Sequence, residues 1–275
     1  MNRLFVVNKP IFKSSNQYMR YIKWKYNTKK VGFSGTLDPF ATGCLIVATG
    51  QYTKLFQYLN KTPKKYRASM WLGAESDSLD IENVYKISEC PTLNLAIIKK
   101  KLDNLIGNLS YLPPKYSAKK IGGKKAYELA RADIDFEQKK ISSIIYSTKL
   151  INYNHPFITF EIEVSEGAYI RSIAQILAEN LNTKATLSAL HRINEGAFYY
   201  NNEKPINPFE HLKIPNNSFL DHSEILELGK KIDSSYFKNR SDGTYLVETE
   251  DFYSIIEIIG KEVKYRLNRI PKPNY

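Results

Sequence analysis

The sequence predicts an α+β protein in which a body built on a mixed or antiparallel sheet is followed by a small β-rich domain. Strand-like and helix-like segments alternate irregularly along the 275 residues, without the repeating βα units of a doubly wound sheet. A polar run rich in Asn and Pro at residues 201–208 is typical of a domain boundary. We therefore expect residues 1–208 to form the body and residues 209–275 the small domain.

Short apolar or alternating segments mark the expected strands. Each is β-branched or of period two, and polar residues, Gly or Pro bound it. In the body they lie at residues 3–8, 44–49, 66–72, 144–154, 157–165 and 186–193. In the small domain they lie at residues 244–248, 253–259 and 263–267.

Apolar residues spaced three or four apart mark the expected helices. The first of these helices begins at the N-cap pair Ser14-Ser15 and runs to about Tyr26. Further helices are expected at residues 51–60, 93–106 and 169–181.

The charge of the chain favours a polyanionic partner. Lys and Arg number 40 against 28 Asp and Glu, a net charge of +12. Residues 1–208 hold 30 basic and 17 acidic side chains, whereas residues 209–275 hold 10 and 11. The positive field therefore belongs to the body, and nucleic acid or an anionic membrane surface would suit it.

Several functional classes are excluded. No apolar stretch approaches the roughly 20 residues of a membrane span, and the N-terminus lacks a signal peptide. Cys44 and Cys90 are too few for a disulfide framework or a four-Cys zinc site, and the four histidines show no metal-binding spacing. We expect a cytoplasmic protein without metal or other cofactor.

Two basic segments are candidates for RNA contact. In the helix at 15–26, tyrosines and Trp24 interleave with basic residues, which suits an RNA-facing surface as well as a solvated helix face. The segment 115–125 carries five lysines and a tyrosine around the Gly122-Gly123 pair. A flexible loop that follows a phosphate backbone and a solvated linker both have this composition.

The loop at residues 32–43 is the most informative segment. Three glycines and Pro39 surround one carboxylate, Asp38, and hold it in a fixed direction before a buried strand. An Asp-Pro pair commonly does no more than cap a turn. In a basic protein, the carboxylate could instead be a covalent nucleophile at a glycosidic carbon or an electron-poor ring carbon. No second carboxylate stands nearby, which disfavours a glycosidase.

A series of motifs in this order resembles the pseudouridine synthases that modify the uridine at position 55 in the T arm of bacterial tRNA. The resemblance covers residues 4–200 and is carried by NKP and SSN, GTLDPFATGCL, KKYRASMWLGAESDSLD, PPKYSAKKIGGKKAYELAR, GAYIRSI, LHRI and EGAF. It implies an RNA isomerase that uses no cofactor. It also implies a pseudouridine synthase body with a PUA-like, RNA-binding C-terminal domain, although the net charge of residues 209–275 disfavours strong phosphate binding there.

The resemblance also assigns roles to individual residues. Asp38 corresponds to the catalytic aspartate, Tyr66 to the tyrosine that stacks on the flipped base, and Arg171 to the arginine that pairs with the aspartate. Asp80 corresponds to a polar member of the same network and Leu190 to an apolar residue of the uracil pocket. As further substrate-binding residues we expect Phe33, Lys9, Lys115, Tyr116, Lys119 and Lys124.

Two positions depart from the family pattern. Phe33 stands where the family usually has a histidine, so stacking or wedging against the RNA could take the place of a polar contact there. In the opening motif the usual glycine is replaced, leaving Lys9-Pro10-Ile11-Phe12-Lys13.

The expected partner is the T arm of tRNA, bound by a monomer that needs no protein partner. Two other functions compete with this one. The chain could be a tRNA-binding or tRNA-folding module, or an RNA-guided synthase in a larger particle. The absence of an extended basic tail disfavours the guided synthase.

Overall fold

The computed structural model describes residues 2–274, and one large sheet forms the body. Within this range, nine strands join in the order β1-β3-β12-β4-β11-β10-β7, with β2 paired to β3 and β13 to β12. All pairings are antiparallel except the short parallel contact of β12 with β3. The predicted α+β class with a mixed sheet is confirmed.

The strands of this sheet have the following bounds: β1 Arg3–Lys9, β2 Val31–Ser34, β3 Thr42–Thr49, β4 Lys64–Leu72, β7 Gly107–Tyr111, β10 Ile141–Asn154, β11 Phe157–Val164, β12 Ala185–Glu195 and β13 Phe198–Tyr199. Two short hairpins stand apart from it, β5 Ala74–Ser76 with β6 Val84–Ile87, and β8 Lys120–Ile121 with β9 Lys124–Lys125.

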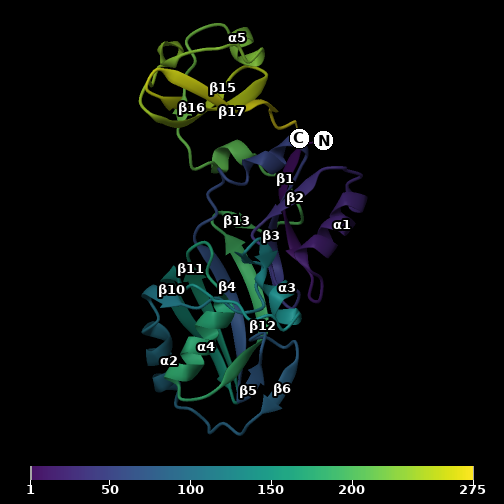
Figure 1. The fold of residues 1–275 in the computed structure, drawn as a ribbon, viewed down its shortest axis with the longest axis vertical. Helices are drawn as coiled ribbons and strands as arrows, with labels where there is room; N and C mark the ends of the chain where they lie inside the picture. The colour runs from purple at the N-terminus through teal and green to yellow at the C-terminus, as the bar shows by residue number, and fades with distance from the viewer. Residues whose placement is uncertain (1, 275) are drawn as a thin grey trace.

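Strand β4 lies in the interior of the sheet, between β12 and β11, and alternate side chains along it are buried. Tyr66, Ala68 and Met70 face the main core, where they meet helix α4 (Ile170–Asn180). Helix α2 (Leu95–Asp103) covers β10 on the same side, as Figure 1 shows. The third short helix of this region, α3 (Ala126–Arg131), follows the β8–β9 hairpin.

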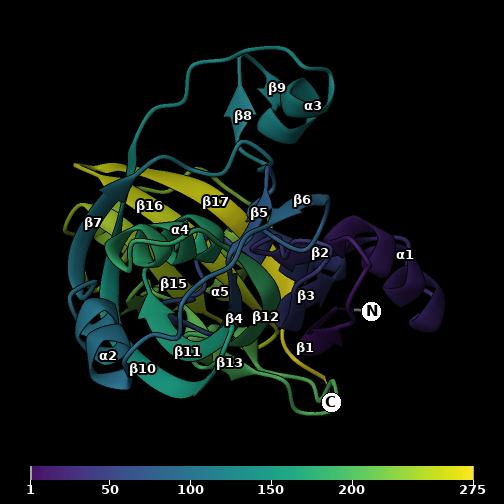
Figure 2. The same cartoon turned by 90° about the horizontal axis from the view of Figure 1, so that it is seen from below.

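Helix α1 (Ser15–Lys25) lies at the opposite edge of the sheet, beside β2 (Figure 2). Ser14 caps it, since its hydroxyl accepts from the Gln17 backbone while the Gln17 side chain accepts from the Ser14 backbone. Met19 and Ile22 anchor the helix in the core. The predicted helix is therefore present and ends one residue early.

The small sheet of the described chain, drawn at the top of Figure 1, has the order β14-β15-β16-β17. Its strands are Asn216–Asn217, Gly243–Glu248, Phe252–Ile259 and Glu262–Pro271, accompanied by α5 (Ser223–Glu227) and the 3₁₀ turns η2 (Pro208–His211) and η3 (Ser234–Tyr236). Phe209 joins the two sheets, because it stacks on Tyr253 at 3.7 Å and meets the Tyr52 ring of the body edge-on at 5.8 Å.

Two local predictions were wrong. The segment 51–60 is not an α-helix; it forms the 3₁₀ helix η1 (Gly50–Leu55) and then turns, because Leu59 has to bridge to Leu212 of the connection to the small sheet. The basic segment 115–125 is not a plain loop either. It contains the β8–β9 hairpin, which turns at Gly122 and Gly123, both with positive φ.

Among residues 2–274, no helix is long and apolar enough to cross a membrane. Cys44 and Cys90 are both free thiols.

Candidate active site

Asp38 lies in the loop between β2 and β3, with one third of its side chain exposed. Glycines with positive φ stand on both sides of it. Gly35 has φ 64°, and a Cβ there would lie 2.8 Å from Lys64 Nζ. Gly43 has φ 105°, and a Cβ there would lie 2.3 Å from the Arg192 carbonyl oxygen, so no other residue fits. The glycines thus allow the loop to press against β12 while Asp38 faces outward.

Arg171 holds the Asp38 carboxylate from the first turn of α4. Its Nε lies 2.9 Å from Asp38 Oδ2, and its Nη1 lies 3.2 Å from Asp80 Oδ2. The remaining donors reach backbone carbonyls, Nη1 to Ser78 at 2.6 Å and Nη2 to Tyr116 at 2.9 Å. The side chain is 4 % exposed, so the guanidinium is fixed on all sides.

Asp80 completes this network from the segment after β5. Its Oδ1 accepts from the Ser78 hydroxyl at 2.6 Å and from the Glu82 backbone at 2.9 Å. Burial raises the pKa of Asp80, and the Ser78 hydrogen bond and the Arg171 charge oppose this shift. Asp80 therefore acts on Asp38 through Arg171, since it balances part of the arginine charge.

A cavity of about 350 Å³ opens in front of Asp38. Its aromatic and apolar lining includes Tyr66, Tyr169, Ile170 and Leu190. Its charged lining is Asp38, Glu166, Lys64, Lys119, Arg171 and Arg192. Tyr66 is 6 % exposed and Leu190 also 6 %, so both present little surface apart from the cavity. The volume lies within the roughly 300–1,000 Å³ of ligand sites in proteins.

A buried ion triad supports this cavity from behind. Glu195 Oε1 lies 2.8 Å from Arg192 Nη2, and Glu195 Oε2 lies 3.0 Å from Lys64 Nζ. Arg192 also donates to the carbonyls of Gly35 at 2.9 Å and Cys44 at 2.8 Å, one on each side of the Asp38 loop. Burial acts to lower the pKa of Arg192, but Glu195 and a hydrogen bond with Tyr66 raise it. The triad therefore connects the loop to the tyrosine.

Lys9 is not placed to bind substrate, which corrects the sequence-based prediction. It is fully buried, and its Nζ donates to the carbonyls of Lys13 at 2.6 Å, Pro10 at 2.8 Å and Pro39 at 3.3 Å. Burial lowers the pKa of Lys9 to about 8, although the Asp38 charge opposes this. The lysine thus ties the end of β1 to the Asp38 loop.

The other predicted substrate-binding residues are distributed over several surfaces. Lys119 lines the Asp38 cavity, and Lys124 is exposed on the β8–β9 hairpin. Phe33 does not line that cavity; it packs partly against the core and borders a hollow beside α1. Phe33 lies on β2, and its direction toward the core follows from the alternation of side chains along the strand. The motif of the family does not show this direction.

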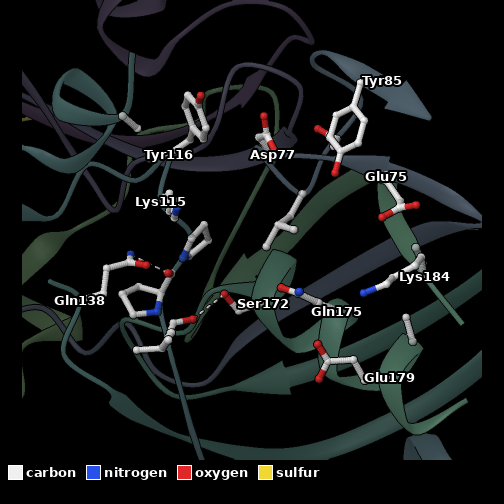
Figure 3. Close-up of a pocket in the computed structure, with 18 of the residues that line it drawn as sticks. Glu75, Asp77, Tyr85, Lys115, Tyr116, Gln138, Ser172, Gln175, Glu179 and Lys184 are labelled. Carbon is white, nitrogen blue, oxygen red and sulfur yellow. Dashed lines mark hydrogen bonds between the residues drawn. The ribbon is translucent and has the colours of Figure 1, made fainter. Parts of the chain in front are cut away.

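Lys115 and Tyr116 line a different cavity, of about 520 Å³, shown in Figure 3. It lies between the 112–116 segment and α4, where Ser172 Oγ donates to the Leu112 carbonyl at 2.9 Å. Its charged lining is mostly acidic, with Glu75, Asp77, Asp133, Asp135 and Glu179 against Lys115 and Lys184. This cavity does not suit a phosphate backbone, so it gives no support to the prediction that Lys115 and Tyr116 contact RNA, which stays a prediction.

Four further residues of the site, Tyr169, Lys64, Arg192 and Glu195, were not predicted from the sequence. Tyr169 and Arg192 belong to the GAYIRSI and LHRI motifs and Glu195 begins EGAF, so these motifs were the available signal. Lys64 is the buried residue two positions before Tyr66 on the same face of β4.

In the described residues, no group of three or more His, Cys, Asp or Glu side chains is arranged to hold a metal ion.

The arrangement is suited to covalent chemistry on a planar ring. A carboxylate held by a fixed arginine faces a cavity with an aromatic wall, which can take a base turned out of an RNA stack. The ion pair with Arg171 holds the carboxylate in a fixed direction, as a nucleophile requires.

Comparisons with known proteins agree with this chemistry. Residues 23–170 match the family model described as TruB family pseudouridylate synthase (N terminal domain). The chain is 62% identical over 272 residues to the tRNA pseudouridine synthase B of Sulfurovum sp. (strain NBC37-1), covering 99% of this chain and 98% of that protein. It is 46% identical over 273 residues to that of Campylobacter concisus (strain 13826), covering 99% of this chain and 100% of that protein.

Solved structures share the fold at low sequence identity. A chain in the crystal structure of a Cbf5-Nop10-Gar1 complex aligns with a TM-score of 0.69 at 17% identity, covering 98% of this chain and 85% of that one. A chain in the structure of an H/ACA RNP bound to a substrate RNA containing 2'-deoxyuridine aligns with a TM-score of 0.66 at 17% identity, covering 98% and 87%.

Proposed function

Because the chain belongs to the TruB family of pseudouridylate synthases and isomerises uridine in tRNA, we propose that Asp38 is its nucleophile and that uridine 55 in the T loop is its target. The observation that carries this proposal is the 2.9 Å ion pair of Arg171 with Asp38 at a cavity that Tyr66 and Leu190 line. A carboxylate that an arginine aims in this way is positioned for attack.

The reaction requires the target base to leave the RNA stack. Extrusion of a base costs a few kcal/mol, which stacking on an aromatic side chain offsets. Tyr66 is the proposed stacking partner, and Leu190 the apolar contact on the uracil. Basic residues around the cavity mouth, including Lys119, hold the backbone of the RNA.

In the first proposed step of the reaction, Asp38 forms a covalent bond to the target nucleotide and the bond between C1′ and N1 breaks. The uracil turns within the cavity, and a bond forms between its C5 and C1′ as the carboxylate is released. C5 loses its proton and N1 gains one, so the product is an isomer of the substrate. We assign Tyr66 a part in this proton removal.

The proposal is tested with an unmodified tRNA transcript, mapped for pseudouridine at nucleotide resolution. Wild type is expected to form it at uridine 55, while Asp38→Asn binds the same tRNA and forms none. The matched control variant is Arg67→Gln, because Arg67 is exposed and pairs with Glu161. Lys9→Met would not serve as a control, because Lys9 holds the loop that carries Asp38. Product at another position from wild type, or full activity of Asp38→Asn, would contradict the proposal.

A second function, refolding of tRNA, is favoured by the charge of the body. Residues 1–208 carry a net charge of +13, more than one flipped nucleotide needs. Refolding of a misfolded transcript by Asp38→Asn at the wild-type rate would establish this role separately from the chemistry.

We further propose that residues 1–208 and 209–275 are the two domains and that the enzyme works as a cytoplasmic monomer. The free thiols of Cys44 and Cys90 are consistent with a reducing compartment. Sedimentation with and without tRNA measures the number of chains in the complex.

A further inference from the structure

We propose that the exposed face of α1 is a second RNA-binding surface, on which unpaired bases of the tRNA stack beside the modified loop. This inference rests on the proposed function, since it adds a contact to the same substrate. We define the surface by Gln17, Arg20, Tyr21 and Trp24, which are all exposed and lie opposite the buried Met19 and Ile22.

Aromatic rings form a continuous row on this helix. The rings of Tyr18 and Tyr21 stack at 5.7 Å, with an interplanar angle of 19°. The next ring, Trp24, lies 5.9 Å from Tyr21. Tyr21 is 44 % exposed and Trp24 78 %, so neither serves the core. Exposed aromatic rings next to positive charge are the elements on which proteins stack single-stranded nucleic acid.

The charge of the segment indicates which partner covers it. Residues 13–30 contain six basic side chains and no acidic one. Lys25 is neutralised by Glu203 at 2.7 Å, whereas Arg20 and Lys23 are exposed and line the hollow between α1 and β2. A surface of this sign and aromatic content complements RNA rather than a second copy of this basic chain.

The helix is held rigidly and begins at the reaction centre. At its first turn, the Ser15 hydroxyl exchanges hydrogen bonds with the Leu37 backbone at 3.0 and 3.1 Å, directly before Asp38. At its far end, Lys25 and Tyr26 both contact Glu203. Eleven residues extend about 16 Å, so the aromatic row leads outward from the site over the width of a few nucleotides.

The test compares tRNA affinity of wild type with the Tyr21→Ala/Trp24→Ala variant. Tyr146→Ala is the control, because Tyr146 is 43 % exposed but lies on β10. Loss of a stacked base is expected to weaken the Kd by at least about fivefold. The dependence of Kd on salt should stay unchanged, whereas Arg20→Ala/Lys23→Ala should make it less steep.

The outcomes separate this inference from the proposed function. Wild type is assayed for pseudouridine on the full tRNA and on its isolated T-arm stem-loop. If Tyr21→Ala/Trp24→Ala binds both RNAs more weakly than wild type does, the stacked base lies in the T arm. If it binds only the full tRNA more weakly, the stacked base lies elsewhere in the tRNA. A Kd within twofold of wild type, or dissociation of a wild-type dimer by the same variant, would overturn the inference even when wild type modifies uridine 55.

Discussion

Arg171 Nε lies 2.9 Å from Asp38 Oδ2, and the same guanidinium is fixed from behind by Asp80 at 3.2 Å. Asp80 therefore helps to hold the guanidinium in place, and the guanidinium sets the direction of the Asp38 carboxylate. The four donor contacts of Arg171 come from its planar fork, a geometry that a lysine ammonium cannot reproduce.

Arg171→Lys is therefore expected to lower the rate constant of pseudouridine formation by about 100-fold, because it keeps the charge but loses the alignment of Asp38. The Kd for tRNA should change little, since the substitution keeps the charge and only 4 % of the Arg171 side chain is exposed. Single-turnover kinetics with saturating enzyme measure the rate constant. Arg67→Lys, at an exposed arginine 2.7 Å from Glu161, is the control. A lysine variant that turns over at the wild-type rate would show that the fork is unnecessary.

Tyr66→Phe tests the hydroxyl separately from the ring. The ring still fills its place on β4 and stacks on the base, so we expect the Kd for tRNA to stay within about threefold. If the hydroxyl takes part in proton removal, the rate of product formation falls by about 100-fold or more. Tyr66→Leu removes the stacking as well and should also weaken binding. Equal product formation by wild type and Tyr66→Phe would assign the proton transfer elsewhere.

The Lys64–Glu195–Arg192 triad predicts an asymmetry of stability. Glu195→Gln leaves two buried cations facing each other, which should lower the free energy of unfolding by about 3 kcal/mol or more. Lys64→Met leaves the neutral Arg192–Glu195 pair intact and should cost less. Urea unfolding of both variants gives the comparison. If Lys64→Met lowered the free energy of unfolding more than Glu195→Gln does, the charge balance of the triad would not explain its contribution to stability.

Lys9 predicts a pH dependence of stability. Burial lowers its pKa to about 8 in the folded protein, against the usual 10.5. Between these values the unfolded chain keeps a proton that the folded protein has lost, so the group contributes stability that rises with pH. The difference in unfolding free energy between wild type and Lys9→Met should therefore rise above pH 8, by up to about 1.4 kcal/mol per pH unit. Urea unfolding from pH 7 to 10 measures it, and a difference that falls with pH would contradict the buried placement.

Local signals in the sequence were sufficient for most elements. The N-cap of α1 was visible in Ser14 because capping depends on neighbours three residues away. Strand alternation located β4 and β11 for the same reason. The segment after Gly50 was assigned wrongly, since its apolar spacing fits a helix and the contact with Leu212 that bends it is remote in sequence.

The α+β class, the positive charge of the body, the family motifs and the candidate Asp38 could all be predicted from patterns in the sequence. Which charged side chains contact one another is visible only in the folded protein. Lys9 and Lys119 look alike as surface lysines, yet one is buried under the loop and the other lines the cavity. The pairing of β4 with β12 brings Tyr66 opposite Arg192, and burial then requires each charge to find a partner. Tyr66 and Arg192, Lys64 and Glu195, and Asp38 and Arg171 each lie more than 100 positions apart, so no local pattern contains these contacts.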